Sequence, residues 1–306
     1  DGYVGGPTDG LCYMCSTDVF MTGMGTTDIA RLQVAAANVN IIIDRPISLH
    51  YKGAALYGNN VDNVTYNVGV NGEVNFGDSS YVGITTSSSL PSPYSATFNL
   101  AGGSFKLQPG MNFNMSVRSG KRAVLNLYSG LTLGDTLFAY SDSAGTEVVN
   151  IHENGGIIFS GMFTDTIRID SLNINSNAGF STPCPIVIKG GLGLQNGVCY
   201  NFPTFRMEKN STIDRALGAL ANKPVFTDTI NVVYSGAIPC TTGYELPYQS
   251  DDAVANLTVY HELYLDSTRY VNNVEAYGGP IIATEGDVVG VFGGSGLNEG
   301  DGQVIG

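Results

Sequence analysis

Apolar residues occur along this chain in short runs that small polar residues interrupt every few positions. Runs of strand length, rich in β-branched and aromatic residues, lie at 40–43, 63–67, 122–128 and 166–169. Almost none of them continues at the helical period of 3.6 residues, so the pattern predicts short β-strands rather than helices. The predicted fold class is therefore all-β.

The residues between these runs are turn formers, above all Gly and Asn, as at 71–72, 102–103, 154–156 and 190–191. Such turns suit a parallel β-solenoid, whose coils stack on one another, and they equally suit the two-residue hairpins of a β-sandwich or jelly roll. Two observations favour a solenoid or another extended β stack. Asn flanks many apolar runs, so amides can stack from coil to coil, and helical crossovers for a parallel sheet are nearly absent.

One segment has the features of a short helix, near residues 212–221. Ser211 and Asp214 have capping-box spacing, Ile213, Leu217 and Leu220 form one apolar stripe, and Pro224 ends the segment. The predicted organisation is an N-terminal arm or cap at 1–37, a main β region at 38–208, and a second β region at 209–306 with an acidic, Gly-rich tail.

Charged residues make up only 13% of the chain, and the net charge is −13. This balance repels nucleic acid, and no apolar run approaches the roughly 18 residues of a membrane helix, so we expect neither nucleic-acid binding nor membrane insertion. The chain starts at Asp1 rather than Met, which fits the removal of a leader and predicts an exported, cell-surface or extracellular protein.

The chain has five cysteines, an odd number, so at least one stays free or pairs between chains. Cys12 and Cys15 have C-x-x-C spacing, but neither the strand–helix setting of a redox motif nor a second close pair for zinc is present. We expect a structural staple or links to a neighbouring subunit. The candidate disulfide residues are Cys12, Cys15, Cys184, Cys199 and Cys240.

If the protein is an enzyme, a β-solenoid suggests a glycosidase or polysaccharide lyase, which needs convergent carboxylates. The candidates are Asp165, Asp170 and Asp228, with Arg168 as a substrate-binding cation. A structural interpretation is favoured, because an Asp in Thr-Asp-Thr is typical of a turn in which the side chain bonds its own backbone.

No cofactor is predicted; the one partial metal motif is the Gly-rich segment 293–302, which partly matches a calcium-binding repeat. Four Asn-x-Ser/Thr sequons are candidate glycosylation sites in an exported protein. They are Asn63, Asn114, Asn210 and Asn256.

Low charge, abundant Gly, Asn, Ser and Thr, short strands throughout and an odd cysteine are together typical of extracellular building material. At this level of composition the chain resembles self-assembling surface-layer, sheath and fibre proteins and the β-helical parts of adhesins and phage tail fibres. The resemblance implies a secreted subunit whose partner is another copy of itself.

The predicted assembly joins strand edges into a filament, sheath or surface layer, with intermolecular disulfides through Cys12 or Cys15 as an added link. Its candidate strand carries Val288, Val289, Val291 and Phe292. The alternatives are a polysaccharide-degrading enzyme and a glycan-binding adhesin on the same fold.

Overall fold

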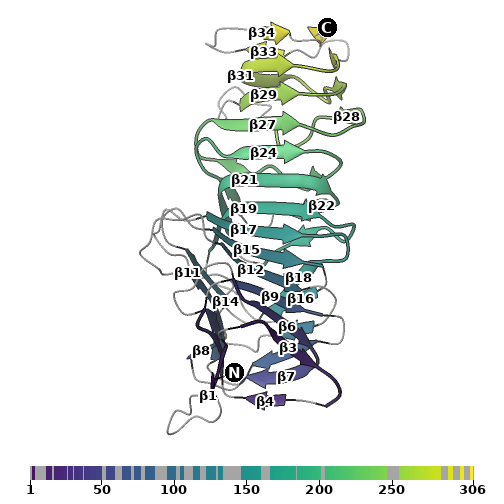
Figure 1. The fold of residues 1–306 in the computed structure, drawn as a ribbon. Coiled ribbons are helices and arrows are strands. Elements are labelled where there is room, and N and C mark those ends of the chain that lie inside the picture. Colours follow the sequence, from purple (N-terminus) through teal and green to yellow (C-terminus); the bar gives the residue numbers. More distant parts are fainter. Residues whose placement is uncertain are drawn as a thin grey trace. The chain divides into compact units, whose positions relative to one another are not determined.

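The computed structural model describes residues 2–3, 12–15, 17–25, 27–29, 31–36, 38–49, 53–58, 64–69, 72–76, 80–86, 95–100, 104–106, 113–117, 122–128, 130–133, 146–159, 166–183, 185–200, 204–246, 255–283, 289–291, 297–299 and 304–305. Contacts divide the chain into two compact units, unit 1 at Asp1–Ile167 and unit 2 at Arg168–Gly306. Every described strand pair is parallel except one, the antiparallel pair of β1 and β2. The protein is an all-β parallel solenoid (Figure 1).

Unit 1 has three sheets, and successive coils add one strand to each of them. Sheet 1 contains β1 (Gly2–Tyr3), β2 (Cys12–Cys15), β5 (Arg31–Val34), β8 (Gly53–Gly58), β11 (Ser80–Thr86) and β14 (Phe113–Val117). Sheet 2 contains β3 (Val19–Thr22), β6 (Asn40–Asp44), β9 (Val64–Val68), β12 (Ser95–Leu100), β15 (Arg122–Leu127) and β17 (Thr146–Ile151). Sheet 3 contains β4 (Thr27–Ile29), β7 (Pro46–Leu49), β10 (Glu73–Phe76), β13 (Ser104–Lys106), β16 (Gly130–Leu133) and β18 (Gly156–Phe159).

Unit 2 is organised around one long parallel sheet with shorter sheets beside it. The long sheet contains β19 (Ile167–Asn175), β21 (Ile186–Asn196), β24 (Thr212–Arg215), β27 (Ile230–Tyr234), β29 (Ala255–Val259), β31 (Arg269–Ala276) and β33 (Val289–Val291), joined by β23 (Phe205–Met207), β26 (Val225–Phe226) and β34 (Leu297–Glu299). The first short sheet contains β20 (Phe180–Ser181), β22 (Val198–Tyr200) and β25 (Ala219–Leu220). The second contains β28 (Cys240–Thr241), β30 (Leu263–Tyr264), β32 (Ile281–Ile282) and β35 (Val304–Ile305).

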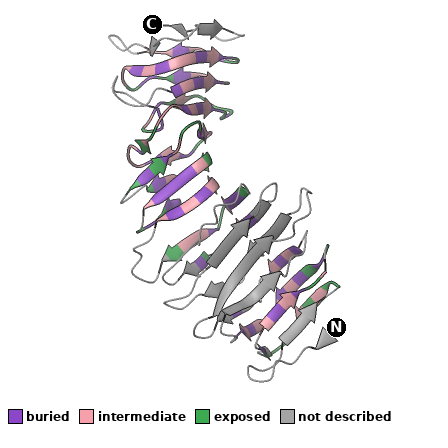
Figure 2. Ribbon diagram, turned by 90° about the vertical axis from the view of Figure 1, so that its left-hand side faces the viewer, coloured by how far each residue is buried: buried purple, intermediate pink, exposed green. Residues whose placement is uncertain are grey.

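The core is made of columns of apolar side chains that repeat from coil to coil. Ile213, Val232, Leu257 and Val274 occupy one register position of the long sheet, and all four are fully buried. The residues between them along each strand are half-exposed, which Figure 2 shows as alternating colours on these strands. This period of two is what a strand with one buried face produces.

Asparagine amides stack from coil to coil on the outer face of the sheets, within strands rather than at the turns where stacking was expected. In unit 1, Asn150 Nδ2 donates to Asn126 Oδ1 at 2.7 Å, 24 residues earlier. In unit 2, Asn273 Nδ2 donates to Asn256 Oδ1 at 3.0 Å, and Asn256 Nδ2 donates to Asn231 Oδ1 at 2.9 Å. In each case the later coil donates to the earlier one, so these amides tie consecutive coils together.

The predicted helix near 212–221 is wrong. Residues Thr212–Arg215 form β24, which pairs in parallel with β21 and β27, and Ala219–Leu220 form β25. Ile213 and Leu220 are buried, but Leu217 is 57% exposed in the turn between the two strands. The helical spacing of these three residues was therefore coincidental, because pairing with the neighbouring coils satisfies the backbone of this segment.

The N-terminal segment that was predicted as an arm or cap contains strands β1 to β5. Of these, β2, β3, β4 and β5 pair in parallel with strands of the following coil. Apart from the antiparallel β1–β2 pair, the described strands do not form the hairpins of a sandwich or jelly roll and pair in parallel with strands of neighbouring coils.

Candidate functional sites

The predicted catalytic carboxylates lie in separate ion pairs. Asp170 on β19 has its Oδ1 3.9 Å from Lys189 Nζ on the neighbouring strand. Asp228, in the turn before β27, accepts from Lys209 Nζ at 2.8 Å and from the backbone N–H of Thr229 at 2.7 Å. Because the hydrogen bonds from Lys209 and Thr229 favour the carboxylate, the pKa of Asp228 lies below its ordinary value.

These contacts give Asp228 the turn-capping geometry expected for an Asp between two threonines. Asp165 lies outside the described residues. Arg168, the predicted substrate-binding cation, has its Nη1 4.0 Å from Glu208 Oε1. The described members of this set are thus each paired with a different residue, and no shared catalytic site brings them together.

The two cysteines whose side chains are described form no disulfide. Cys199 and Cys240 are free thiols, and burial raises the pKa of Cys199 to about 12. Cys12 and Cys15 are the two ends of strand β2, where an extended backbone separates their Cα atoms by about 10 Å. A disulfide needs Cα atoms within about 7 Å, so these two residues do not bridge each other in this fold. Cys184 lies outside the described residues.

The predicted assembly strand is part of β33. Its residues Val289 and Val291 pair in parallel with Arg269 and Val271 of β31, and β34 pairs with the next stretch of the same strand. Among the described strands, β33 and β34 thus lie at the end of the long sheet. We call the strand or strands that one coil adds to a sheet a rung, so β33 and β34 form the last described rung. Val288 and Phe292 lie outside the described residues.

Two of the four sequons have described side chains. The side-chain amide of Asn256 is hydrogen-bonded to those of Asn231 and Asn273, and we call this row of three amides the ladder. Asn210 is exposed and lies in a turn, where its backbone φ is 60°. Asn63 lies outside the described residues, and Asn114 is placed only as part of β14. A glycan on Asn256 would be attached to the nitrogen that donates to Asn231, whereas the Asn210 side chain is exposed, so Asn210 is the more accessible acceptor of the two.

β3, the first strand of sheet 2, is less covered than the strand that follows it in that sheet, β6. Val19 and Met21 of β3 lie in register with Ile41 and Ile43 of β6. The two isoleucines are fully buried, whereas Val19 and Met21 are half-exposed because β3 is the outermost strand. On the same rung Phe20 is 66% exposed.

A buried cluster of charged side chains lies in unit 2, and the sequence did not reveal it. Glu245 is fully buried, and its Oε1 accepts from Tyr234 Oη at 2.7 Å, from the Gly243 N–H at 2.9 Å and from Arg215 Nη1. Glu245 Oε2 is buried without a hydrogen-bond partner in the described part of the chain. Burial and the adjacent Glu245 together raise the pKa of Tyr234 well above its ordinary value.

A second part of the cluster fixes the turn after β30. Arg269 is only 2% exposed; its Nη1 donates to Leu246 O at 2.6 Å, and its Nε and Nη2 both donate to Asp266 Oδ1. Thr242 Oγ1 donates to the same oxygen at 2.5 Å and accepts from the Asp266 N–H at 3.0 Å. Burial raises the pKa of Asp266, but the bonds from Thr242 and Arg269 outweigh it, so the net shift is downward.

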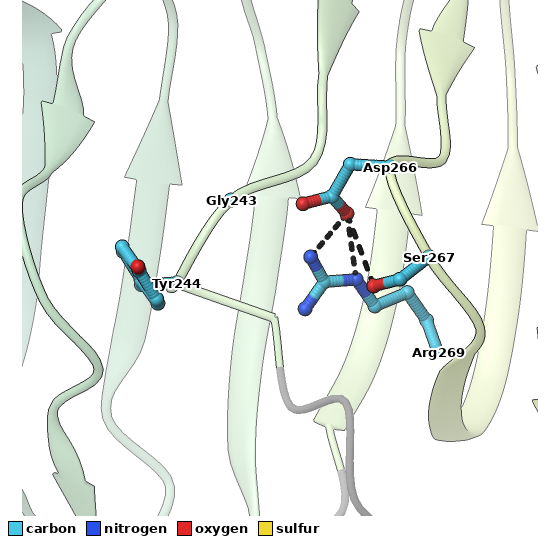
Figure 3. A pocket seen from close by; sticks show the side chains of 5 residues that line it. All are labelled: Gly243, Tyr244, Asp266, Ser267 and Arg269. Atoms are coloured by element: carbon cyan, nitrogen blue, oxygen red, sulfur yellow. Dashed lines mark hydrogen bonds and ion pairs between the residues drawn. The ribbon is translucent and has the colours of Figure 1, made fainter.

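The turns that follow β28 and β30 border a pocket of about 380 Å³. Its lining residues are Gly243, Tyr244, Asp266, Ser267 and Arg269 (Figure 3). The two turns belong to adjacent coils, and the backbone N–H of Thr242 donates to Tyr264 O at 2.8 Å. The pocket is therefore built by coil stacking from segments more than twenty residues apart in sequence.

The part of the chain that the structure describes contains no group of three His, Cys, Asp or Glu side chains placed to hold a metal ion. The segment 293–302 lies outside the described residues except for 297–299. None of the described residues belongs to a helix long and apolar enough to span a membrane. Comparisons with protein-family models, with curated proteins and with solved structures found no match.

Proposed function

We propose that this protein is a secreted structural subunit that assembles head to tail, through its strand edges, into an extracellular filament, sheath or surface layer. The observation that carries the proposal is the partial exposure of β3, the first strand of sheet 2. Val19 and Met21 repeat the register of a fully buried column but remain half-exposed, so a further rung placed against β3 would complete the core.

The occupant of this position is a second copy of the chain, because β33 and β34 form the last described rung of the long sheet in unit 2. The strands of each long sheet are parallel, so the first and last rungs are different surfaces and pair head to tail. A contact between two different surfaces does not close on itself in general, and it extends into a filament.

Exposed apolar side chains at the same edge support this proposal. Phe20 is 66% exposed on β3, and Met24 is 98% exposed in the turn that follows it. Natural proteins protect exposed strand edges with charge, proline or a covering segment. An edge that instead displays large apolar side chains is a surface suited to docking another strand.

Sheet 1 limits where the next copy docks. Its outermost strand β1 runs antiparallel to β2, so the parallel order ends there. Sheets 2 and 3 end in β3 and β4, which pair in parallel with β6 and β7. The docking rung therefore meets β3 and β4 rather than β1.

Sedimentation velocity over a range of protein concentrations tests this proposal. The wild-type chain is expected to form large species as its concentration rises. Phe20→Lys is expected to leave it monomeric, because the charge stands at the proposed interface. Leu217→Lys is the matched control, since Leu217 is comparably exposed but lies in a turn within unit 2.

A wild-type chain that stays monomeric at every concentration overturns the proposal. Equal assembly of the wild-type and Phe20→Lys chains overturns the assignment of the interface. Gel electrophoresis with and without reductant tests the disulfide link through Cys12 or Cys15 separately, and a monomer under both conditions removes that part.

A further inference from the structure

We propose that the pocket between the turns after β28 and β30 binds one neutral sugar ring. This site goes beyond the proposed function, because a structural subunit needs no ligand pocket for assembly. The inference depends on three features of the pocket: a rigid carboxylate with one oxygen facing the ligand, an exposed aromatic ring across from it, and a balanced local charge.

The carboxylate is that of Asp266. The described hydrogen bonds of its side chain, from Thr242, Ser267 and Arg269, all end on Oδ1. Figure 3 shows the bonds from Ser267 and Arg269 converging on one oxygen, while the other oxygen points toward the Gly243 and Tyr244 side of the pocket. Asp266 Oδ2 is thereby held in place as an acceptor, and sugar hydroxyls are hydrogen-bond donors that such an oxygen binds.

The aromatic ring is that of Tyr244, which is 42% exposed and lies across the pocket from Asp266 and Arg269 (Figure 3). An exposed ring offers a flat apolar face, and the C–H face of a sugar ring is the complementary surface. Ser267 adds a hydroxyl at the Asp266 side of the pocket. The pocket volume of about 380 Å³ lies near the small end of the roughly 300–1,000 Å³ typical of ligand sites, which suits a small ligand.

The charges at the site favour a neutral sugar over an acidic or amino sugar. Arg269 is buried, and three of its five N–H groups donate to Asp266 and to Leu246 O, so most of its donors are already used within the protein. The same guanidinium compensates the charge of Asp266, which reduces the attraction for a cationic ligand. The hydroxyl groups of a neutral sugar need only an acceptor, and removing them from water costs less free energy than removing an ion.

The two turns are held in place before any ligand arrives. The Thr242 hydroxyl donates to the Asp266 carboxylate and accepts from the Asp266 backbone N–H. Arg269 donates both to Asp266 and to the backbone oxygen of Leu246. Glu245, next to Tyr244 in the chain, is anchored to Arg215 and Tyr234. Because the site is organised in advance, binding costs little ordering of the protein.

Saturation-transfer difference NMR with purified protein tests the site. The probes are the methyl glycosides of glucose, galactose and mannose, and N-acetylglucosamine. At least one is expected to bind the wild-type chain. Tyr244→Ala is expected to weaken that binding about two- to tenfold, and Tyr244→Phe to retain it, because the ring face makes the contact. Tyr200→Ala, at a comparably exposed tyrosine on β22, is the matched control and is expected to change nothing.

The charge argument is tested by comparing the bound sugar with its uronic acid and its amino sugar, which share the ring and differ in charge. The neutral sugar is expected to bind more tightly than either. Absence of binding by all four neutral probes overturns the proposal. So does binding that Tyr244→Ala leaves unchanged, or tighter binding of a charged analogue. None of these outcomes bears on assembly, which Phe20→Lys tests at a different surface.

Discussion

Replacing Glu245 by Gln tests whether the buried cluster of unit 2 holds the coils together. The substitution keeps the size of the side chain and removes its charge. Arg215, whose side chain is 13% exposed, then lies buried without its ionic partner. Breaking a buried ion pair in this way costs about 3–5 kcal/mol, because the remaining charge is left desolvated.

Hydrogen exchange measured by mass spectrometry is the suitable assay, because a solenoid opens locally and a single global free energy of unfolding is poorly defined. A loss of about 3 kcal/mol corresponds to exchange roughly 100-fold faster in the peptides that contain β24 and β27. Lys209→Gln is the control. It breaks the exposed pair with Asp228, whose side chains are 65% and 42% exposed, and is expected to leave exchange unchanged.

The Arg215→Gln variant and the double variant complete the test. If the two side chains act as a pair, the double variant is expected to be little worse than either single variant. Unchanged exchange in β24 and β27 after Glu245→Gln, or strictly additive effects of the two substitutions, would refute the reasoning.

Three further predictions concern the ladder, a histidine and a thiol. Asn256→Ala removes two amide hydrogen bonds and is expected to cost about 1–2 kcal/mol of local stability, read by hydrogen exchange in β29; Thr258→Ala on the same strand is expected to cost less. Burial lowers the pKa of His152 below 6.5, so the folded chain takes up a proton at His152 at a lower pH than the unfolded chain does. Unit 1 is therefore expected to lose stability as the pH falls below about 6.5. The His152→Gln variant is expected to lose less stability over the same pH range, measured by thermal melts across pH. Cys199, buried and with a raised pKa, is expected to react with iodoacetamide only after denaturation, whereas labelling of the native protein would contradict its placement.

The solenoid could be predicted from the sequence because its features are local. Strand-length apolar runs, Gly and Asn turns, and Asn residues beside the runs each reflect a single coil. Amides do stack from coil to coil, but Asn231, Asn256 and Asn273 do so within strands rather than at the expected turns. The turns alone do not distinguish a solenoid from a sandwich, because the same turns suit hairpins. The helix prediction failed because Ile213, Leu217 and Leu220 have helical spacing by chance. Only Ile213 and Leu220 are buried, so the three residues do not form one apolar face.

The cluster and the pocket could not be predicted in the same way. Arg215 and Glu245 are 30 residues apart, and Thr242 and Asp266 are 24 apart, so coil stacking rather than any motif brings each pair together. One signal was available: residues spaced by about one coil length lie side by side in a solenoid. A search for polar residues at that spacing would include the pair of Thr242 and Asp266, but coil lengths vary with turn length, so the register cannot be fixed from the sequence.

Cryo-electron microscopy of the purified chain at high concentration tests the central claim most directly. Head-to-tail docking against β3 predicts unbranched filaments in which the sheets continue across the subunit boundary at the strand spacing of about 4.7–4.9 Å. Isolated single particles, with the β3 rung facing solvent or covered by the chain's own residues, would contradict it.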